Sequence, residues 1–532
     1  MTLLHHLLDR SASRSPHKEA LRFRGEAILY GDLQQLTLRT AAGLRALGIA
    51  RGDRVVIFLA NRPEMVEVAL ACSRLGAIFV PVSPMLRGRQ LTHILRDSGA
   101  KTLLVSDSLL PHALQSAVDC PDLLNIVLAD ATQLPSPSRF GLCYSLLDDL
   151  RSYDAESLHG SPTIDRDVAA ILYTSGSTGR SKGVTLTHQN LVSGATCVAQ
   201  YLGNTADDRL LAALPLSFDY GLSQVTTAFH VGACATLTNF SMPAAIVQEV
   251  AAEKITGLAG VPTMWAHLAT AEWPASVREH LRYITNSGGA LTQPLIRTLR
   301  TVLPSTLVYC MYGLTEAFRS TYLDPEQLDR RPGSIGKAIP NQEILVLRPD
   351  GTRCQPGEIG ELVHRGSLVA RGYWNDSEAT NQRYRPLPPG LAGVAPGELA
   401  VWSGDLARTD EDGYLYFVGR ADQLIKTSGY RVSATEIEEV VAEVDGVIES
   451  AAFGIADAVL GQKIVIAVVN KTSNATDLVE RIRRHCRMHM PAYMTPADIQ
   501  IVGQLPRNAN GKPDRTALTA DWQENSRVAA RA

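Results

Sequence analysis

A short run of small hydroxyl and glycine residues ending in a lysine constrains this chain more than any other stretch. It spans residues 174–182 and follows Ile171, Leu172 and Tyr173, which have the apolar character of a buried strand. Glycine lets a backbone turn tightly and approach a ligand closely. Backbone N–H groups and hydroxyls at such a turn bind anions, and a lysine adds a point charge for phosphate. The run therefore predicts a loop that holds a polyphosphate at the end of a strand.

The run differs from the common P-loop, in which Gly-Lys-Ser/Thr follows four spacer residues. Here Lys182 follows Ser181 and precedes Gly183. Taken alone, a Gly/Ser stretch of this kind is equally compatible with a flexible surface loop. Further motifs are needed to decide between the two interpretations.

Strand-like and helix-like stretches alternate through the first two thirds of the chain. A strand is expected over 54–59, a helix over 64–75, strands over 78–82 and 101–105, and a helix over 91–96 between the last two. This alternation predicts a large N-terminal domain of layered α/β subdomains.

From about Ser334 the pattern changes to short antiparallel strands with tight turns, which predicts a small β-barrel or a meander. A compact α+β unit follows Gly419–Asp422, and its helix starts at the capping pair Ser433 and Glu436. We therefore expect an N-terminal domain over 1–421 and a smaller, mobile C-terminal domain over 422–532.

Composition excludes several classes of protein. The 51 basic and 54 acidic residues give a net charge of -3, and this balance argues against a general nucleic-acid binder. The eight cysteines lack C-x-x-C spacing, so reduced thiols in a cytoplasmic protein are expected rather than a disulfide framework or a zinc site. No secretory signal is recognised at the start, and no apolar run is long enough to span a bilayer.

Four further segments combine glycine with chemically active side chains. Each of the first two directly follows a strand-like stretch, and the last places a lysine behind a glycine. They are Asn286-Ser-Gly-Gly-Ala290, Tyr312-Gly-Leu-Thr-Glu316, Trp402-Ser-Gly-Asp-Leu406 and Leu505-Pro-Arg-Asn-Ala-Asn-Gly-Lys512.

With these motifs in this order, the chain resembles the AMP-forming acyl and aminoacyl ligases over nearly its whole length. That family includes acyl-CoA synthetases, adenylation domains of peptide synthetases and firefly-type luciferases. The resemblance implies that a carboxylate attacks the α-phosphorus of ATP, pyrophosphate leaves, and a thiol captures the acyl adenylate. An anion attacking a polyanion needs positioning and charge neutralisation more than covalent catalysis.

The resemblance implies a role for each matching residue. Lys512, Thr174 and Glu316 are expected to act in catalysis, with Mg²⁺ on Glu316. Tyr312 is expected to stack on adenine, Thr315 to contact the α-phosphate, and Asp405 to accept the ribose hydroxyls with Arg420 in support. The expected ATP-binding residues are Thr174, Ser175, Gly176, Ser177, Thr178, Gly179, Lys182, Gly288, Gly289, Ala290, Tyr312, Gly313, Thr315, Asp405, Arg420 and Lys512.

The resemblance also implies a moving C-terminal domain. Asp422 falls at the family's hinge, so the small domain is expected to rotate between the two half-reactions. One pose inserts Lys512, and the other lays Gly429 and Tyr430 along a tunnel for a pantetheine thiol. The thiol is expected to belong to CoA or to the phosphopantetheine of a carrier protein. The sequence leaves the acceptor and the oligomeric state open.

The substrate pocket is expected to include Phe218, Asp219, Tyr220, Trp265 and Asn286. An aspartate at the position of Asp219 pairs with the substrate ammonium in amino-acid-activating relatives, which indicates an amino acid or a small acyl acid. The segment resembles prolyl-type carrier-protein ligases and equally resembles acyl-CoA ligases of exopolysaccharide and exosortase loci. A structural role for Asp219, a non-amino acid substrate and a non-thiol acceptor all stay open.

Overall fold

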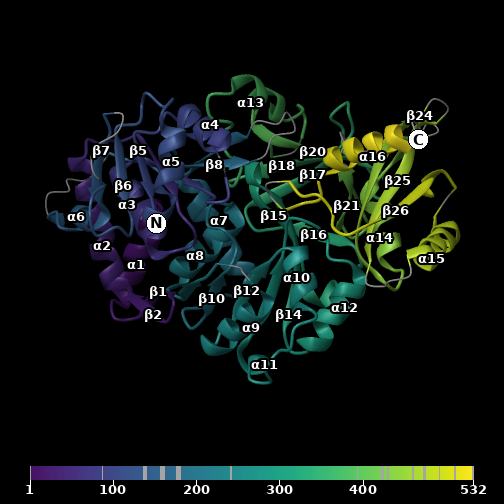
Figure 1. The fold of residues 1–532 in the computed structure, drawn as a ribbon, viewed down its shortest axis with the longest axis horizontal. Coiled ribbons are helices and arrows are strands. Elements are labelled where there is room, and N and C mark those ends of the chain that lie inside the picture. Colours follow the sequence, from purple (N-terminus) through teal and green to yellow (C-terminus); the bar gives the residue numbers. More distant parts are fainter. Residues whose placement is uncertain are drawn as a thin grey trace.

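The computed structural model describes residues 2–86, 88–135, 141–155, 162–174, 181–239, 242–391, 393–420, 425–427, 430–457, 460–470, 475–490, 492–508 and 511–529. Two large sheets with helices between and around them make up the first four fifths of the chain. A third, smaller sheet follows at the C-terminal end (Figure 1).

The first sheet has seven strands among the described residues, in the order β7-β6-β5-β3-β4-β8-β9, and all neighbours except β8 and β9 run parallel. Its strands are β3 (Arg54–Phe58), β4 (Ile78–Val82), β5 (Thr102–Val105), β6 (Asn125–Leu128), β7 (Cys143–Leu146), β8 (Val168–Thr174) and β9 (Lys182–Thr187).

Helices cover both faces of this sheet, which explains why its strands are apolar without interruption. Val55 and Ile57 of β3 join one core, whereas Val56 and Phe58 join another on the opposite face. The first core includes α1 (His5–Arg14), α2 (Tyr30–Ala46) and α3 (Pro63–Leu75), with the short α6 (Leu147–Arg151) beside α2. The second includes α4 (Gly88–Ser98) and α5 (Leu110–Ala117).

The second sheet has a parallel centre and a long antiparallel extension, in the order β17-β18-β20-β21-β16-β15-β14-β13-β12-β10-β11-β1-β2. The strands at and beyond its parallel centre are β1 (Glu19–Phe23), β2 (Glu26–Leu29), β10 (Arg209–Ala212), β11 (Cys234–Leu237), β12 (Gly257–Gly260), β13 (Tyr283–Asn286) and β14 (Leu307–Leu314). The extension contains β15 (Phe318–Leu323), β16 (Ser334–Ala338), β17 (Gln342–Leu347), β18 (Gly360–Gly366), β19 (Tyr384–Pro386), β20 (Leu399–Thr409) and β21 (Leu415–Arg420).

The predicted small β-barrel is wrong. Strands over 334–420 do form, with the expected tight turns, but they continue the second sheet instead of closing on themselves. Within the described residues β17 pairs only with β18, so it is an open edge of the sheet. Alternation of apolar residues predicts which strands pair, whereas closure depends on tilt and register over many strands.

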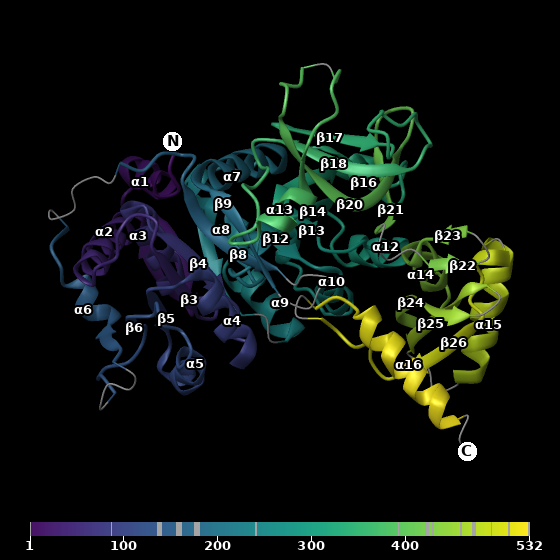
Figure 2. The ribbon, with the colours of Figure 1, turned by 90° about the horizontal axis from the view of Figure 1, so that it is seen from above.

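Helices α7 (His188–Leu202) and α8 (Asp219–Val231) pack on each other between the two large sheets (Figure 2). The Thr187 side chain caps α7 by accepting a hydrogen bond from the backbone N–H of Asn190. The Asn190 side chain in turn accepts a hydrogen bond from the backbone N–H of Thr187. The remaining helices of this part are α9 (Pro243–Ala252), α10 (Pro262–Leu268), α11 (Val277–His280), α12 (Gln293–Val302) and α13 (Ser377–Arg383).

The C-terminal sheet has its own core. Its strands are β22 (Ile425–Thr427), β23 (Tyr430–Val432), β24 (Val447–Asp457), β25 (Gly461–Asn470) and β26 (Asp498–Val502). One apolar cluster joins it to α14 (Ala434–Ala442) and α15 (Ala475–His489), and a second joins it to α16 (Arg515–Ala529). The α+β character is as predicted, but residues 421 and 422, where the domain boundary is predicted, lie outside the described residues.

Two other expectations concern the whole chain. All eight cysteines are free thiols. Across the ranges given above, no helix combines the length and the apolar character that crossing a bilayer requires.

Candidate active site

The predicted phosphate loop connects two antiparallel strands. β8 ends at Thr174, β9 begins at Lys182, and the two residues are register partners, so they lie side by side at the open end of the hairpin. His93 of α4 donates a 2.9 Å hydrogen bond from Nε2 to the carbonyl of Ser181. The predicted loop residues Ser175, Gly176, Ser177, Thr178 and Gly179 lie outside the described residues.

Lys182 is linked to the predicted metal ligand through a tyrosine. Its Nζ lies 5.2 Å from the centroid of the Tyr373 ring, within cation–π range. The Tyr373 hydroxyl donates a 2.5 Å hydrogen bond to Oε1 of the buried Glu316. Tyr373 also forms an isolated β-bridge with Val184 of β9. The phosphate hairpin and Glu316 therefore share one supporting side chain.

Arg383, the last residue of α13, connects Glu316 to the nucleotide side of the site. Its Nε lies 3.8 Å from Oε1 of Glu316. Its Nη1 donates to the carbonyls of Trp402, at 3.1 Å, and of Ser403. Arg383 therefore contributes positive charge beside Glu316 and fixes the strand that carries Asp405.

Glu316 sits on a strained turn. The 3₁₀ turn Thr315–Ala317 joins β14 to β15, and Phe318 leaves it at φ 56° and ψ -107°. A positive φ is unfavourable for a bulky residue and persists only where the surroundings enforce it. The Phe318 side chain is 1% exposed and packs beside Gly194 of α7, and the backbone of Ala370 donates to the Glu316 carbonyl at 2.9 Å. Packing thus holds the turn.

Asp405 and Tyr312 form the centre of the predicted nucleoside site. The Tyr312 hydroxyl donates a 2.5 Å hydrogen bond to Oδ2 of Asp405, and Arg420, its register partner on β21, places Nη1 3.5 Å from Oδ1. Burial raises the pKa of Asp405 above its ordinary value, and Arg420 and the Tyr312 hydrogen bond oppose that rise. Burial and the Asp405 charge raise the pKa of Tyr312 well above normal, so it stays a donor.

Two other rings lie near the ring of Tyr312. His364 is nearly parallel to it at 5.9 Å, and Phe417 is 6.0 Å away. Gly313 comes next, where an added Cβ would lie only 2.5 Å from the Phe318 carbonyl oxygen. A side chain at that position would displace the backbone of β15 at Phe318, directly after the turn that carries Glu316.

The predicted glycine turn at 288–290 follows the end of β13. Gly288 has a φ of +82°, and an added Cβ on Gly289 would lie 3.1 Å from Pro262. The Asn286 side chain donates from Nδ2 to the Gly289 carbonyl at 2.8 Å. Residues 288–290 are exposed and present their backbone to solvent, as a surface for the edge of a base requires.

The start of α8 carries the predicted substrate residues. Phe218 caps this helix, and Asp219 is its first residue. Burial raises the pKa of Asp219, whereas the charge of Arg319 lowers it, and Glu316 adds to the rise. Asp219 therefore lies close to the predicted metal ligand and to a cation that the sequence did not single out.

Tyr220 and Trp265 are both buried, but they differ in their surroundings. The Tyr220 hydroxyl lies 2.7 Å from Oγ1 of Thr285, and burial raises its pKa to about 12 although the charge of Arg319 opposes the rise. Trp265 is fully buried and fills the space that a side chain on Gly260 would need. Trp265 is thus part of the core behind the pocket.

Lys512 reaches this site from the C-terminal sheet. It lies on a tight turn between β26 and α16, where its backbone exchanges two hydrogen bonds with Asn508 and Gly511 adopts a φ of +74°. Although part of the side chain is exposed, desolvation lowers the pKa of Lys512 below the ordinary 10.5, and the charges of Asp405 and Asp219 oppose that change. Lys512 therefore stands within electrostatic reach of both Asp405 and Asp219.

The predicted hinge and tunnel residues fall mostly outside the described ranges. Asp422 and Gly429 are not among the described residues, and Tyr430 begins β23 opposite Thr427. Their roles stay predictions. Four residues that the sequence did not single out also surround the site: Tyr373, Arg383, His364 and Arg319.

The residues present fit a nucleotide and a magnesium ion. Oδ1 of Asp405 is buried, and within the described ranges it has no hydrogen-bond partner, which suits an acceptor for sugar hydroxyls. Glu316 offers a single carboxylate, and no three His, Cys, Asp or Glu side chains gather into a metal site in the part of the chain that is described. Mg²⁺ commonly takes one or two carboxylates and completes its shell with phosphate and water oxygens.

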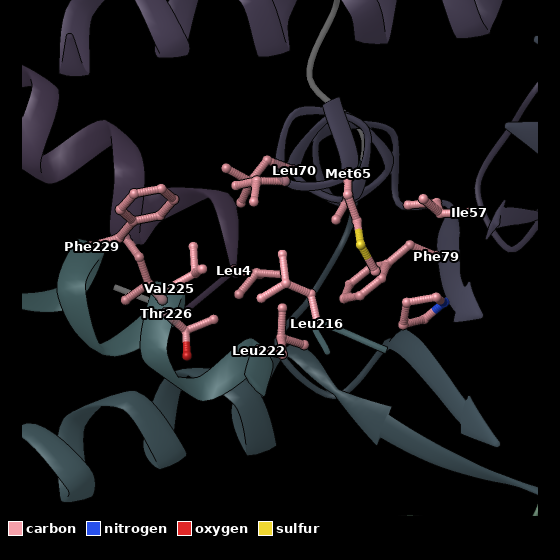
Figure 3. Close-up of a pocket in the computed structure, with 14 residues that line it drawn as sticks. Leu4, Ile57, Met65, Leu70, Phe79, Leu216, Leu222, Val225, Thr226 and Phe229 are labelled. Carbon is pink, nitrogen blue, oxygen red and sulfur yellow. The ribbon is translucent and has the colours of Figure 1, made fainter. Parts of the chain in front are cut away.

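A small apolar cavity lies elsewhere, in the core. Leu4, Met65, Phe79, Leu216, Leu222 and Phe229 are among the side chains that surround it, between α1, α3 and α8 (Figure 3). Its volume of about 20 Å³ holds roughly one water molecule. It is a packing gap in the core and is too small for an acyl chain.

Comparison with known proteins places these features in a family. The AMP-binding enzyme family model matches residues 8–374, and the AMP-binding enzyme C-terminal domain model matches residues 436–512. Tyrocidine synthase 3 of Brevibacillus parabrevis is 29% identical over 98% of this chain, which spans only 8% of that protein.

Two further relatives match end to end. Feruloyl-CoA synthase of an Amycolatopsis species is 31% identical over 94% of this chain and 96% of its own length. The o-succinylbenzoate CoA synthetase of Bacillus subtilis, solved in complex with its acyl-adenylate intermediate, is 28% identical, covers 96% of this chain and 97% of its own, and superimposes with a TM-score of 0.81. From its family-model match and these relatives, the chain belongs to the AMP-binding enzyme family.

Proposed function

We propose that this chain is an AMP-forming acid–thiol ligase. A carboxylate oxygen of the acid attacks the α-phosphorus of ATP, the bond to the β-phosphate oxygen breaks, and pyrophosphate leaves with its electron pair. A thiol then attacks the acyl carbon of the adenylate, gives its proton to solvent, and releases AMP. The products are a thioester, AMP and pyrophosphate.

The position of Lys512 carries this proposal. Its charge acts on both Asp405 and Asp219, which belong to the predicted ribose site and the predicted acid pocket. A cation between these two places would neutralise the carboxylate and the α-phosphate as they approach each other. Preorganised charge of this kind, placed where negative charge accumulates, provides much of the rate acceleration in many enzymes.

The other end of the site supports the same reaction. Thr174 and Lys182 would hold the β- and γ-phosphates, and Tyr373 and Arg383 would orient the Glu316 carboxylate. A magnesium ion on Glu316 would supply charge neutralisation for the phosphate oxygens. Tyr312 and Asp405 would bind the nucleoside, with the backbone at 288–290 along the edge of the base.

The proposal also concerns the identity of the thiol acceptor and of the acid substrate. Two relatives carry CoA in their names, which supports CoA as the thiol. A phosphopantetheinyl carrier protein and a non-thiol acceptor are the alternatives. For the acid, Asp219 supports an amine-bearing substrate, and the charge of Arg319 also acts on its carboxylate without forming an ion pair with it in the described residues.

Acid-dependent exchange of labelled pyrophosphate into ATP tests the first half-reaction. We expect exchange with at least one member of a panel of proteinogenic amino acids and aliphatic and aryl acids. Adding CoA or a holo carrier protein should then yield a thioester. Exchange without thioester formation would favour a non-thiol acceptor, and no exchange with any acid would contradict the proposed activity.

Gly429→Trp separates the two steps. If Gly429 lies along the thiol tunnel, the bulky side chain blocks thioester formation and spares exchange. Gly503→Trp is the matched control, because Gly503 is exposed in the same part of the chain and has no atom within 4 Å of an added Cβ. Equal loss of both steps in Gly429→Trp would count against the tunnel.

A further inference from the structure

Arg319 is a buried cation with an incomplete set of partners. It is 2% exposed, and the described residues place no carboxylate within ion-pair distance of it. Buried arginines in proteins are almost always paired, because desolvating an unpaired charge is strongly unfavourable. This residue therefore calls for a physical explanation.

Its contacts leave one edge of the guanidinium available. The guanidinium carbon Cζ lies 4.0 Å from the centroid of the Tyr220 ring and 5.8 Å from that of the Phe318 ring. Nη1 lies 3.9 Å from the sulfur of Met311, which is a weak acceptor. Nη2 is buried and lacks any hydrogen-bond partner in the described part of the chain. An unpaired Nη2 on a guanidinium held beside an aromatic ring suits a carboxylate that approaches in the plane of the guanidinium.

Arg319 also lies in the predicted acid pocket. Tyr220 follows Asp219 at the start of α8, and its hydroxyl meets Thr285, the neighbour of Asn286 on β13. Arg319 itself comes three residues after Glu316, just past the strained turn. Its contact with the Tyr220 ring therefore places the Arg319 guanidinium beside the start of α8, where the predicted acid pocket lies.

Asp219 does not complete the site around Arg319. The charges of Asp219 and Arg319 attract each other, but these two described residues form no ion pair. The charges of Glu316 and Lys512 also act on Asp219. One guanidinium edge consequently stays desolvated with an unmade hydrogen bond. The most stable partner for that edge is a second carboxylate, which can accept two parallel N–H bonds.

We infer that Arg319 selects an acid with two carboxylates, one reacting at Lys512 and the other bound by the Arg319 guanidinium. This inference rests on the proposed function and narrows its substrate class to dicarboxylic acids, with or without an amino group. Arg319 is a specificity-determining residue in this assignment. A site built to hydrogen-bond a substrate group rejects analogues that lack it by large factors.

Matched acids test the inference in the wild-type enzyme. Each diacid from malonate to adipate is compared in pyrophosphate exchange with the monoacid of equal chain length and with its half-amide. Aspartate and glutamate are compared likewise with 2-aminobutyrate, norvaline, asparagine and glutamine, which distinguishes amino from non-amino diacids. We expect kcat/KM for the best diacid to exceed that of its monoacid and half-amide by about 100-fold or more.

Arg319→Met should reduce that ratio to near 1, and Arg319→Lys should retain part of it. Because replacing an unpaired buried charge with an apolar side chain is often neutral or stabilising, Arg319→Met should unfold at or above the wild-type temperature. Arg300→Met is the control, since Arg300 pairs with the exposed Asp329. Calorimetric titration of the wild type with the best diacid and a non-hydrolysable ATP analogue should show binding that Arg319→Met weakens.

The outcomes separate this inference from the proposed function. Exchange that is equally fast with monoacids or half-amides would overturn the role of Arg319 and leave the ligase activity standing. A sharp fall in the unfolding temperature of Arg319→Met, with the wild-type substrate ratio retained, would assign Arg319 a structural role instead. Absence of exchange with every acid would remove the proposed function itself, and the inference with it.

Discussion

The Tyr373 hydroxyl donates its hydrogen to Glu316, while the Tyr373 ring lies under the amine of Lys182. One side chain thereby supports two groups that are predicted to handle the phosphates, although the three residues come from different segments. Tyr373 touches no reacting atom in the proposed mechanism and acts as a positioning residue. Its effect on activity should appear through the groups that it holds.

Tyr373→Phe should weaken magnesium-dependent catalysis. The ring and its contact with Lys182 remain, but a hydrogen bond to a carboxylate is lost, worth about 1.5–3 kcal/mol. We expect kcat/KM for ATP to fall by about 10- to 100-fold and the Mg²⁺ concentration for half-maximal exchange to rise. Tyr384→Phe is the control, because the Tyr384 hydroxyl is buried and makes no hydrogen bond in the described residues. Equal effects in the two variants would argue against the positioning role.

Lys512→Ala should lower acid-dependent pyrophosphate exchange by several orders of magnitude while ATP still binds. Lys463→Ala, on the same part of the chain, is the control and should exchange normally. Near-normal exchange in Lys512→Ala would refute the catalytic assignment.

The lowered pKa of Lys512 predicts how activity falls on the alkaline side of the pH–rate profile. Because desolvation lowers the pKa of Lys512, activity should decline at a pH below 10.5 as the amine loses its proton. Lys512→Arg keeps its charge to far higher pH, so whatever activity it retains should lack this limb. A limb that stays unchanged in Lys512→Arg would belong to another group.

Asp405→Asn should stabilise the protein without nucleotide at neutral pH. The pKa of Asp405 is raised in the folded state. The protonated carboxyl therefore contributes its whole stabilisation at a pH below the pKa of an unfolded aspartate, about 4, and this stabilisation is lost as the pH rises through the pKa of the folded state. The variant should therefore unfold at a higher temperature than the wild type at pH 7, and the difference should shrink towards pH 4. ATP binding should weaken, because an acceptor for the ribose is lost. Asp329→Asn, at an exposed site, should show neither effect.

Gly194→Ala should destabilise the fold and reduce activity. Alanine usually stabilises a helix relative to glycine by about 0.5–1 kcal/mol. On α7, however, the added Cβ would lie 2.4 Å from Cε1 of Phe318, so the strained turn beside Glu316 must shift. Gly88→Ala on α4 meets no atom within 4 Å and should be neutral or slightly stabilising. Thermal unfolding and exchange rates measure both effects, and a stabilised Gly194→Ala would disprove the clash.

The sequence predicted the layered α/β architecture because local patterns carry it. The strand expected over 54–59 is β3, and the helix expected over 64–75 is α3, with its end marked by Gly76 in the left-handed region. The predicted barrel failed because its strands pair as expected but join a sheet whose other members are distant in sequence. Local alternation contains no information on that joining.

In the candidate site, too, residues in local motifs could be predicted from the sequence, whereas residues that only the fold brings together could not. Lys182, Glu316, Asp405 and Lys512 stand in glycine-containing motifs, and their spacing made them recognisable. Tyr373 and Arg383 belong to no recognisable sequence motif, and only the fold brings their side chains to Glu316. Arg319 lies within a recognised segment, but arginine is usually a surface residue, and only its burial in the structure distinguishes it.

The strained turn at Phe318 ties two properties of the enzyme together. Glu316 and Arg319 stand on either side of it, so the predicted metal ligand and the proposed acid-binding residue share one rigidly packed turn. Substitutions that shift this turn should therefore affect the acid and the ATP together, because both proposed sites depend on its packing. Laboratory evolution towards a new acid should therefore accumulate its first compensating substitutions in the packing around Phe318 rather than in the pocket.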